Sequence, residues 1–448
     1  MGAASLMIRQ LYSLLMWAAQ PFLRRKLRRR GLAEPGYLDA IEERFGHYTQ
    51  PAETASELVW VHAVSLGETR TAGILLAALR AQWPGLRILL THGTATGRAE
   101  GAGLLRAGDV QVWQPWDSQA AVARFFTHFK PRLGLLMETE VWPNTVAGAQ
   151  ARGVPLVLVN ARLSDKSLQQ ALRIARLSRP AYAALAAVYA QSDNDAERLR
   201  AIGARVEGVF GNLKFDAAPD AAQQELGRRW RQALGRPVLM LASSREGEED
   251  DFLKQITALA LSTRAQPAPE IRADGEPVPV AADFQILIVP RHPQRFDEVQ
   301  ALVEKHGLTV SRRSGWNGAP PAAADVWLGD SLGEMALYYA MSDVALLGGS
   351  FAPLGGQNLI EAAACGCPVI MGPHTFNFAE VAELAEAAGA ARRVSDMAEA
   401  VRAARAMLSR PSAQQAAAAA GRQFSAQHRG AAANTVQALA HFLDEPTH

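Results

Sequence analysis

The stretch Leu58–Glu68, LVWVHAVSLGE, contains the features that decide the fold. Its first part, Leu58–Val64, is a short apolar run with β-branched and aromatic side chains, which predicts a buried strand. Ser65-Leu66-Gly67 reads as a turn, and from Thr69 onward the apolar residues recur at helical spacing. A glycine turn between a strand and a helix directs free backbone N–H groups outward, and Glu68 lies at its mouth.

Glu68 has two interpretations. A carboxylate at the carboxyl end of a strand can remove a proton from a substrate hydroxyl as a general base. Ser65-x-x-Glu68 also fits a capping box, in which Glu68 would only return a hydrogen bond to the Ser65 backbone. The stretch by itself leaves both interpretations open.

The alternation of strand and helix continues along most of the chain. The expected strands of the first half are Leu58–Val64, Arg87–Thr91, Val110–Gln114, Leu133–Met137, Leu156–Val159, Ala187–Ala190 and Val206–Phe210. The pattern breaks at Ala217-Ala218-Pro219-Asp220 and resumes with Pro237–Ala242, Phe284–Val289, Asp325–Leu328, Val344–Leu347 and Val369–Met371. We therefore expect two parallel α/β domains, residues 31–218 and 219–448, that bind ligands beyond the carboxyl ends of their strands.

Composition fits a globular protein rather than a nucleic-acid binder. The chain has 448 residues, 49% of them hydrophobic and 20% charged, with a net charge of +2. Cys365 and Cys367, the two cysteines of the sequence, have a spacing that fits neither a zinc pair nor a redox C-x-x-C motif. We expect both to be small buried side chains of a protein in a reducing compartment.

Residues 1–30 have a different character. Gln10–Leu23 is uncharged and mostly apolar, and Arg24–Arg30 is a dense basic run. Fourteen helical residues reach about 21 Å, which is less than a hydrocarbon core of about 30 Å. The pattern predicts an amphipathic or membrane-inserting anchor whose basic side chains face anionic lipid. The alternative is a solvated basic helix that packs on the body of the protein.

Polar residues follow several expected strands of the first domain. Glu138 and Glu140 come directly after Leu133–Met137 and could share a proton or order a cation, or could simply complement a helix dipole. Lys214 follows the last strand of this domain and could meet a phosphate or carboxylate, although a surface lysine is the simpler interpretation.

The second domain carries candidate anion-binding residues. Arg291 lies between prolines at a strand end, where a guanidinium can bind an anion in a bidentate manner. Gly348-Gly349 and Gly355-Gly356 precede a helix, which predicts a phosphate site without a Walker lysine or a G-x-G-x-x-G motif. Glu361, in the first turn of that helix, could accept hydrogen bonds from the two hydroxyls of a ribose or could complement the helix dipole.

Seven motifs in order carry a family resemblance. They are HAVSLGE, METEVWPN, NARLS, GNLKFD, ILIVPRHPQRF, GDSLGEM and LLGGSFAPLGGQNLIEAAACGCPVIMGPHTFNF. With them, the chain resembles the 3-deoxy-D-manno-octulosonic acid (Kdo) transferases of Gram-negative lipopolysaccharide synthesis, from the N-terminal segment to about Phe378.

The resemblance implies a GT-B fold, in which two Rossmann-like domains face each other across a cleft, with an N-terminal membrane-associating helix. It implies an inverting glycosyltransferase that moves Kdo from CMP-Kdo to the lipid A precursor, lipid IVA, at the cytoplasmic face of the inner membrane. The first domain would bind the acceptor and the second the donor, with no metal and no cofactor.

The resemblance also assigns residues. Glu68 matches the general base, and Glu138 and Lys214 match positions that stabilise the transition state. The CMP-binding positions correspond to Pro290, Arg291, Gly333, Glu334, Met335, Asn358, Leu359, Ile360 and Glu361. Gln357 stands where many relatives have histidine, which excludes a proton donor of neutral pKa at that position.

Two other classes fit parts of the pattern. A GT-B sugar-nucleotide epimerase, or a transferase that uses UDP- or GDP-sugars, would share the glycine turns and the ribose-binding glutamate. A membrane-tethered nucleotide-binding scaffold would share the anchor and the nucleotide site without catalysis. The sequence does not determine the number of Kdo residues transferred or the oligomeric state.

Overall fold

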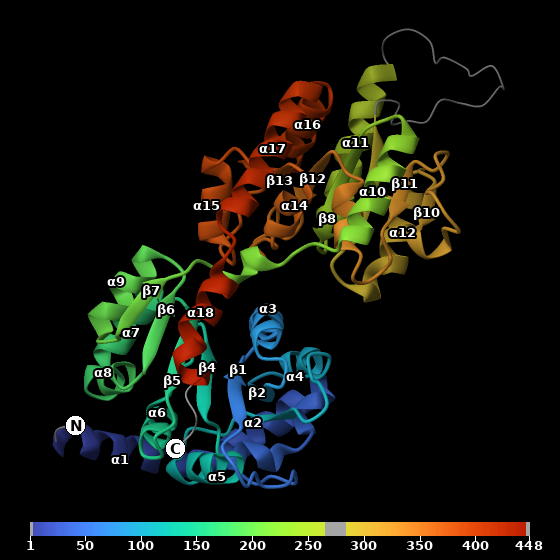
Figure 1. Ribbon diagram of the computed structural model, residues 1–448. Helices are drawn as coiled ribbons and strands as arrows, with labels where there is room; N and C mark the ends of the chain where they lie inside the picture. The colour runs from blue at the N-terminus through green and yellow to red at the C-terminus, as the bar shows by residue number, and fades with distance from the viewer. Residues whose placement is uncertain (1–2, 265–283, 445–448) are drawn as a thin grey trace. The chain divides into compact units, whose positions relative to one another are not determined.

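The computed structural model describes residues 3–264 and 284–444, which form two compact units. Of these residues, 3–216 and 428–444 belong to unit 1, and 217–264 and 284–427 belong to unit 2 (Figure 1). Each unit contains one seven-stranded sheet within the described part of the chain, and the recorded strand pairs of both sheets are parallel. The prediction of two parallel α/β domains is confirmed.

Unit 1 orders its strands β3-β2-β1-β4-β5-β6-β7. These strands are β1 (Leu58–His62), β2 (Arg87–His92), β3 (Val110–Trp113), β4 (Leu133–Met137), β5 (Leu156–Ala161), β6 (Ala187–Ala190) and β7 (Val206–Val209). Its helices are α1 (Ala3–Ala18), α2 (Gln20–Ala33), η1 (Pro35–Leu38), η2 (Ile41–Phe45), α3 (Leu66–Gln82), α4 (Ala95–Ala102), α5 (Gln119–Phe129), α6 (Pro143–Gln150), α7 (Asp165–Arg173), α8 (Ala175–Ala183), α9 (Asp193–Ile202), η3 (Leu213–Asp216) and α18 (Ala431–Leu443).

Helices cover both faces of this sheet because its strands are apolar on both sides. In β1, Trp60 belongs to a cluster with Phe125 of α5, and Val61 belongs to a second cluster with Leu75 of α3. Strands buried on both faces give near-continuous apolar runs in a sequence. That property explains why these strands could be recognised from Leu58–Val64 and its counterparts.

Unit 2 orders its strands β10-β11-β9-β8-β12-β13-β14. These strands are β8 (Val238–Ser244), β9 (Gln285–Pro290), β10 (Val310–Arg312), β11 (Val326–Leu328), β12 (Val344–Leu347), β13 (Val369–Met371) and β14 (Ala391–Arg393). Its helices are α10 (Ala221–Leu234), α11 (Glu248–Arg264), η4 (Pro293–Arg295), α12 (Phe296–Lys305), η5 (Arg313–Gly315), α13 (Met335–Ala340), α14 (Ile360–Cys365), α15 (Ala379–Ala387), α16 (Met397–Leu408) and α17 (Pro411–Gln427).

Both sheets contain a point where the strand order reverses. In unit 1, successive strands spread in one direction from β1 and in the other from β4, and β1 and β4 are neighbours. In unit 2 the corresponding neighbours are β8 and β12. The connections on either side of such a switch point leave the sheet on opposite faces, which opens a crevice at the carboxyl ends of the two strands.

The C-terminal helix corrects the predicted domain boundary. Residues 219–448 were expected to form one domain, yet α18 packs against α3 and η3 of unit 1 (Figure 1). The Asp216 carboxylate accepts hydrogen bonds from the backbone N–H groups of Gly430 and Ala432, both at 2.6 Å. Leu439 enters the same apolar cluster as Leu75. Chain order alone carries no signal for this return.

The N-terminal helices also belong to unit 1, whereas residues 1–30 were expected to be separate. Tyr12 forms a hydrogen bond with Asp117, and Ser13 Oγ donates to Asn144 Oδ1 at 3.0 Å. Leu27 of α2 is buried. Within residues 3–264 and 284–444, no helix combines the length and apolar character needed to cross a membrane.

Candidate active site

Glu68 lies at the switch point of unit 1, in the first turn of α3 after β1. Ser65 caps the helix, because its Oγ accepts the Glu68 N–H at 3.3 Å and donates to Glu68 Oε1 at 3.0 Å. The second carboxylate oxygen accepts the Val64 N–H at 2.9 Å. The sequence predicted that Glu68 would accept the backbone N–H of Ser65, but the N–H that it accepts is that of Val64. This bond fixes the carboxylate without excluding a role as base.

Burial raises the pKa of Glu68, and the negative charges of Glu138 and Glu140 raise it further. The hydrogen bonds from Val64 and Ser65 oppose that shift without cancelling it. The three carboxylates that the sequence singled out therefore interact electrostatically. A carboxylate with a raised pKa is a stronger base than an ordinary surface glutamate.

Glu138 follows β4 in a strained backbone conformation. Its φ is +57°, in the left-handed region that side chains disfavour, and its side chain is only 5% exposed. Its carboxylate accepts a hydrogen bond from Arg162 Nε at 2.6 Å, and Lys214 Nζ lies 3.9 Å from Glu138 Oε1. Such strain persists only where neighbouring contacts hold it, and it is concentrated at functional sites.

The next strand end holds this arrangement in place. Asn160 at the end of β5 also has a positive φ, +51°, and its Oδ1 accepts the Leu213 N–H at 3.0 Å. This bond fixes η3 and so positions Lys214, the next residue. Arg162 was not assigned a role from the sequence, because its partner Glu138 lies 24 residues away.

Glu140 is the third carboxylate of the acidic cluster formed by Glu68, Glu138 and Glu140. Its Oε2 accepts the indole N–H of Trp142 at 2.7 Å. Burial raises the pKa of Glu140, and the charge of Glu138 adds to that shift despite the hydrogen bond.

In unit 2, the residues predicted to bind CMP follow β9, β11 and β12. The backbone N–H of Arg291 donates to Ser244 O at 3.0 Å, which ties the loop after β9 to the end of β8. Glu334, which follows the left-handed Gly333 and precedes α13 at Met335, accepts hydrogen bonds from Arg313 Nη2 at 2.8 Å and from Ser331. Asn358 Oδ1 accepts the Ile360 N–H at 3.1 Å at the start of α14, beside Leu359 and Glu361.

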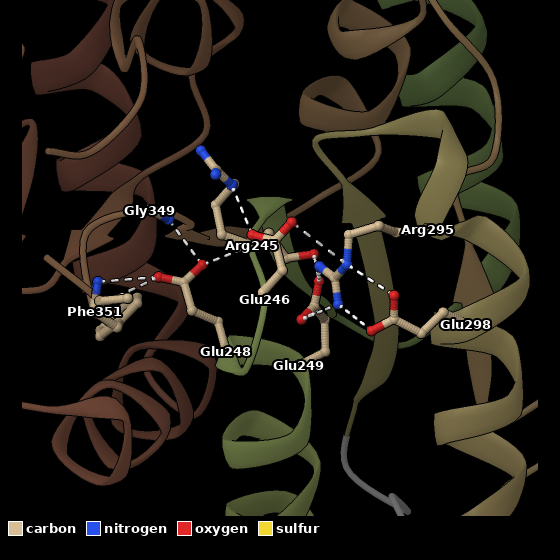
Figure 2. A network of polar contacts seen from close by, with 10 residues as sticks. Arg245, Glu246, Glu248, Glu249, Arg295, Glu298, Gly349 and Phe351 are labelled. Atoms are coloured by element: carbon tan, nitrogen blue, oxygen red, sulfur yellow. Dashed lines mark hydrogen bonds and ion pairs between the residues drawn. The ribbon is translucent and has the colours of Figure 1, made fainter. Parts of the chain in front are cut away.

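A buried glutamate that the sequence analysis missed organises the switch point of unit 2. Glu248 Oε2 accepts the backbone N–H groups of Arg245 and Gly349 at 2.9 and 2.8 Å. Its Oε1 accepts those of Phe351 and Ala352 at 3.2 and 3.3 Å, as Figure 2 shows for Phe351. The glycine turn predicted to bind phosphate at Gly348-Gly349 thus directs the Gly349 N–H to a carboxylate of the protein itself.

Near Glu248, two further glutamates, Glu249 and Glu298, pair with one arginine. Arg295 forms ion pairs with the fully buried Glu249 at 2.6 Å and with Glu298 at 2.8 Å (Figure 2). Burial lowers the pKa of His292, and the charges of Arg245 and Arg291 lower it further against the opposing charge of Glu246.

Comparison with known proteins identifies the chain. A family profile described as 3-deoxy-D-manno-octulosonic-acid transferase (kdotransferase) matches residues 39–217. A 3-deoxy-D-manno-octulosonic acid transferase of Bordetella pertussis is 52% identical over 348 residues, which are 77% of each chain. The chain belongs to the Kdo transferase family.

More distant relatives agree with this assignment. The Kdo transferase of Haemophilus influenzae is 31% identical over 384 residues, or 84% of each chain. A crystal structure of UDP-GlcNAc 2-epimerase from Neisseria meningitidis, bound to UDP-GlcNAc, superimposes with a TM-score of 0.54 at 15% identity and covers 87% of this chain and 100% of that one. The latter similarity concerns the fold alone. This Kdo transferase is therefore a glycosyltransferase with two parallel-sheet α/β domains of the GT-B kind, and the epimerase and scaffold alternatives are set aside.

We predict that Glu248→Gln destabilises unit 2 of this Kdo transferase. Gln keeps one acceptor oxygen and places an NH₂ group against backbone donors, so at least one buried N–H loses its partner, at a cost of about 1–3 kcal/mol. The measurements are the melting temperature and amide hydrogen exchange over residues 348–352, which should accelerate.

Glu246→Gln is the matched control, because Glu246 lies in the same loop with its side chain 58% exposed. Its ion pairs at the surface should contribute less than about 1 kcal/mol. Equal exchange in both variants would show that Glu248 does not hold the turn.

Proposed function

We propose that this enzyme transfers Kdo from CMP-Kdo to the hydroxyl of a lipid A precursor, with Glu68 as the general base. The observation that carries the proposal is the partly buried Glu68 carboxylate, whose pKa is raised by burial and by Glu138 and Glu140. A sugar hydroxyl is a poor nucleophile until its proton is removed, and a fixed carboxylate of raised pKa suits that task.

The proposed step is a single displacement. The acceptor oxygen attacks the anomeric carbon of Kdo while its proton passes to Glu68. The bond from the anomeric carbon to the phosphate oxygen breaks on the opposite face, and CMP leaves with the electron pair. The configuration at the anomeric carbon is therefore inverted.

Positive charge near the reacting atoms would stabilise the transition state. Lys214 and Arg162 both lie beside Glu138, within ion-pair distance of its carboxylate. We assign Glu138 the role of holding Lys214 toward the developing negative charge of the leaving group, in keeping with electrostatic stabilisation by preorganised groups.

Donor binding is assigned to unit 2. The Arg291 guanidinium is suited to the phosphate of CMP, and Glu361 to the ribose hydroxyls. Pro290, Gly333 to Met335 and Asn358 to Ile360 would complete the CMP site. The proposed transfer therefore uses residues of both units, since the base belongs to unit 1 and the donor residues to unit 2.

We also propose that unit 1 rests on the cytoplasmic face of the inner membrane. Large apolar side chains of α1 are exposed, among them Leu11 (57%), Leu14 (58%) and Trp17 (64%). The exposed basic side chains of α2 follow directly. An exposed apolar face beside a basic one complements an anionic lipid surface.

The direct test is mass spectrometry of the product formed from CMP-Kdo and lipid A precursor. A mass increase of one or more Kdo residues, with CMP released, is the expected result. An unchanged acceptor would refute the donor and acceptor assignment.

Substitution of the base gives a sharper prediction. Glu68→Gln should lower turnover by about 10²–10⁴, since Gln cannot take up a proton. The Gln side chain still accepts one of the capping bonds, so the melting temperature and CMP affinity should change little.

In the wild type, the acidic limb of kcat/KM against pH should lie above the ordinary range of a glutamate, because the pKa of Glu68 is raised. If folded Glu68→Gln enzyme transfers Kdo at near the wild-type rate, Glu68 is not the base, and Glu138 or Glu140 becomes the candidate.

For the donor site, we predict that Arg291→Ala and Glu361→Ala each weaken CMP binding by about 1.5–3 kcal/mol, the range for hydrogen bonds to charged groups. Isothermal calorimetry with CMP measures the effect. Arg152→Ala, an exposed arginine of unit 1, is the control and should bind CMP normally. Wild-type affinity in both donor-site variants would mean that the nucleotide binds elsewhere.

For the membrane surface, we predict that the triple variant Leu11→Ser, Leu14→Ser, Trp17→Ser partitions at least about tenfold less onto anionic vesicles, because burial of each such side chain contributes about 1.5–3 kcal/mol. Vesicle co-sedimentation is the measurement. The control replaces three exposed apolar residues elsewhere, Val209, Leu332 and Leu384, with serine. Equal partitioning of the two triple variants would contradict the assignment of α1.

A further inference from the structure

A pocket of about 370 Å³ lies within unit 1 and is lined in part by Glu140 of the acidic cluster. Its lining includes Met16 of α1, Arg44 of η2, Trp116, Glu140 and Trp142. The volume is in the range of pockets that bind small molecules. No role was assigned to Arg44 or Trp116 from the sequence.

Arg44 is an unusual residue in this pocket because it is 3% exposed and, among the described residues, has no ion pair with a carboxylate. Its Nη2 donates to Gly93 O at 3.0 Å, and its guanidinium lies 3.8 Å from the ring centre of Trp113. In the described part of the chain its Nε has no hydrogen-bond acceptor. A buried cation is normally paired.

The nearby carboxylate does not supply that pairing. Glu43 accepts hydrogen bonds from Arg98 at 2.7 Å, from Gln50 at 2.9 Å and from the Trp113 N–H at 2.9 Å. Burial lowers the pKa of Arg44 to about 10, and the positive charges of Arg98 and Arg30 act in the same direction. The charge of Glu43 opposes this shift, but no carboxylate forms an ion pair with Arg44 among the described residues. An anion in this pocket would meet that guanidinium beside the carboxylates of Asp117 and Glu140, which also line the pocket.

Trp116 also lines this pocket. Its Nε1 is buried and, within the described residues, has no acceptor. An indole N–H and a guanidinium can only donate hydrogen bonds. Two donors without acceptors are suited to a ligand group that carries several acceptor oxygens and a negative charge, and a phosphate has this chemistry.

Two residues of the pocket lining, Val64 and Glu140, connect the pocket with the proposed base, Glu68. Glu140 and Val64 line the pocket, and the Val64 N–H is the group that binds the Glu68 carboxylate at 2.9 Å. A sugar in this pocket can thus present an anionic substituent to Arg44 and a hydroxyl to the carboxylates. Met16 comes from α1, whose outward face is apolar, so a hydrophobic tail could continue along that helix.

We infer that this pocket binds the headgroup of the acceptor, with the Arg44 guanidinium and the Trp116 indole N–H holding a phosphate carried by its sugar. The inference rests on the proposed function, since it takes the hydroxyl of the same headgroup to be activated by Glu68. Arg44 is a specificity-determining residue in this arrangement: it selects acceptors that carry the anion.

The test compares two proteins and two acceptors. Wild type and Arg44→Gln are each titrated by calorimetry with the lipid A precursor in detergent micelles, before and after phosphatase treatment of the acceptor. A lost hydrogen bond to a charged group should weaken binding by about 10- to 100-fold. Removal of the phosphate should weaken binding at least as much as removal of the guanidinium, because the phosphate also contacts the Trp116 N–H. Once the phosphate is gone, Arg44→Gln should cause little further loss.

Other measurements separate the possible causes. Trp116→Phe removes only the N–H and should show the same non-additivity with a smaller loss, and it serves as the test protein if Arg44→Gln does not fold. Arg152→Gln, an exposed arginine of unit 1, is the matched control. CMP affinity and the KM for CMP-Kdo should stay at wild-type values in all three.

Three outcomes would overturn the inference. They are equal losses on the phosphorylated and dephosphorylated acceptors, a raised KM for CMP-Kdo in place of weaker acceptor binding, and binding of inorganic phosphate alone as tight as that of the acceptor. The last would make the pocket a site for free anions. Failure of the wild type to transfer Kdo would instead refute the proposed function, so the two failures are distinguishable.

Discussion

The reversal of strand order in each parallel sheet is the constraint on which the rest of this molecule depends. At such a point two neighbouring strands send their connections to opposite faces, so polar groups at their carboxyl ends are not covered by a common loop. In unit 1 the strands are β1 and β4, and Glu68, Glu138 and Glu140 follow them. In unit 2 they are β8 and β12, and Glu248 spans the two loops by binding Arg245 and Gly349.

The two switch points treat negative charge differently. In unit 2, the Glu248 carboxylate accepts four backbone N–H groups, and Glu249 pairs with Arg295. Burial raises the pKa of Glu248 as well, but the groups around it are backbone donors rather than other carboxylates. In unit 1, burial likewise raises the pKa values of Glu68 and Glu140, and the negative charge of Glu138 raises them further. Repulsion between neighbouring carboxylates is therefore what distinguishes the switch point of unit 1. An acid group whose charge is left partly uncompensated is the kind that catalysis requires. The left-handed backbone of Glu138 is a further cost that a purely structural role would not need.

Most of the fold, and part of the site, could be predicted because the relevant signals are local. Continuous apolar runs predicted β4, β6, β12 and β13 with their observed bounds. The strands β10 and β14 were not predicted, because they are three-residue edge strands with arginine at their ends and carry no such run. Glu138 was found because it directly follows a strand, and Glu68 because it follows the turn between a strand and a helix. Arg162 and Glu248 were missed because their partners lie 24 and 101 residues away. Arg44 was missed for a related reason, since only the folded chain shows that Glu43, its neighbour in sequence, is bound to Arg98 instead.

Helix α1 connects the two proposals that concern the acceptor. Its inner face is fixed to unit 1 by Tyr12 and Ser13, and Met16 forms part of the pocket wall. Its outer face carries the exposed Leu11, Leu14 and Trp17. A helix held in this way cannot move with the lipid independently of the pocket. Contact of its outer face with a bilayer would therefore place the pocket at a fixed depth relative to the lipid headgroups, and the same side-chain contacts that dock α1 would set which part of the acceptor reaches Arg44 and Glu68.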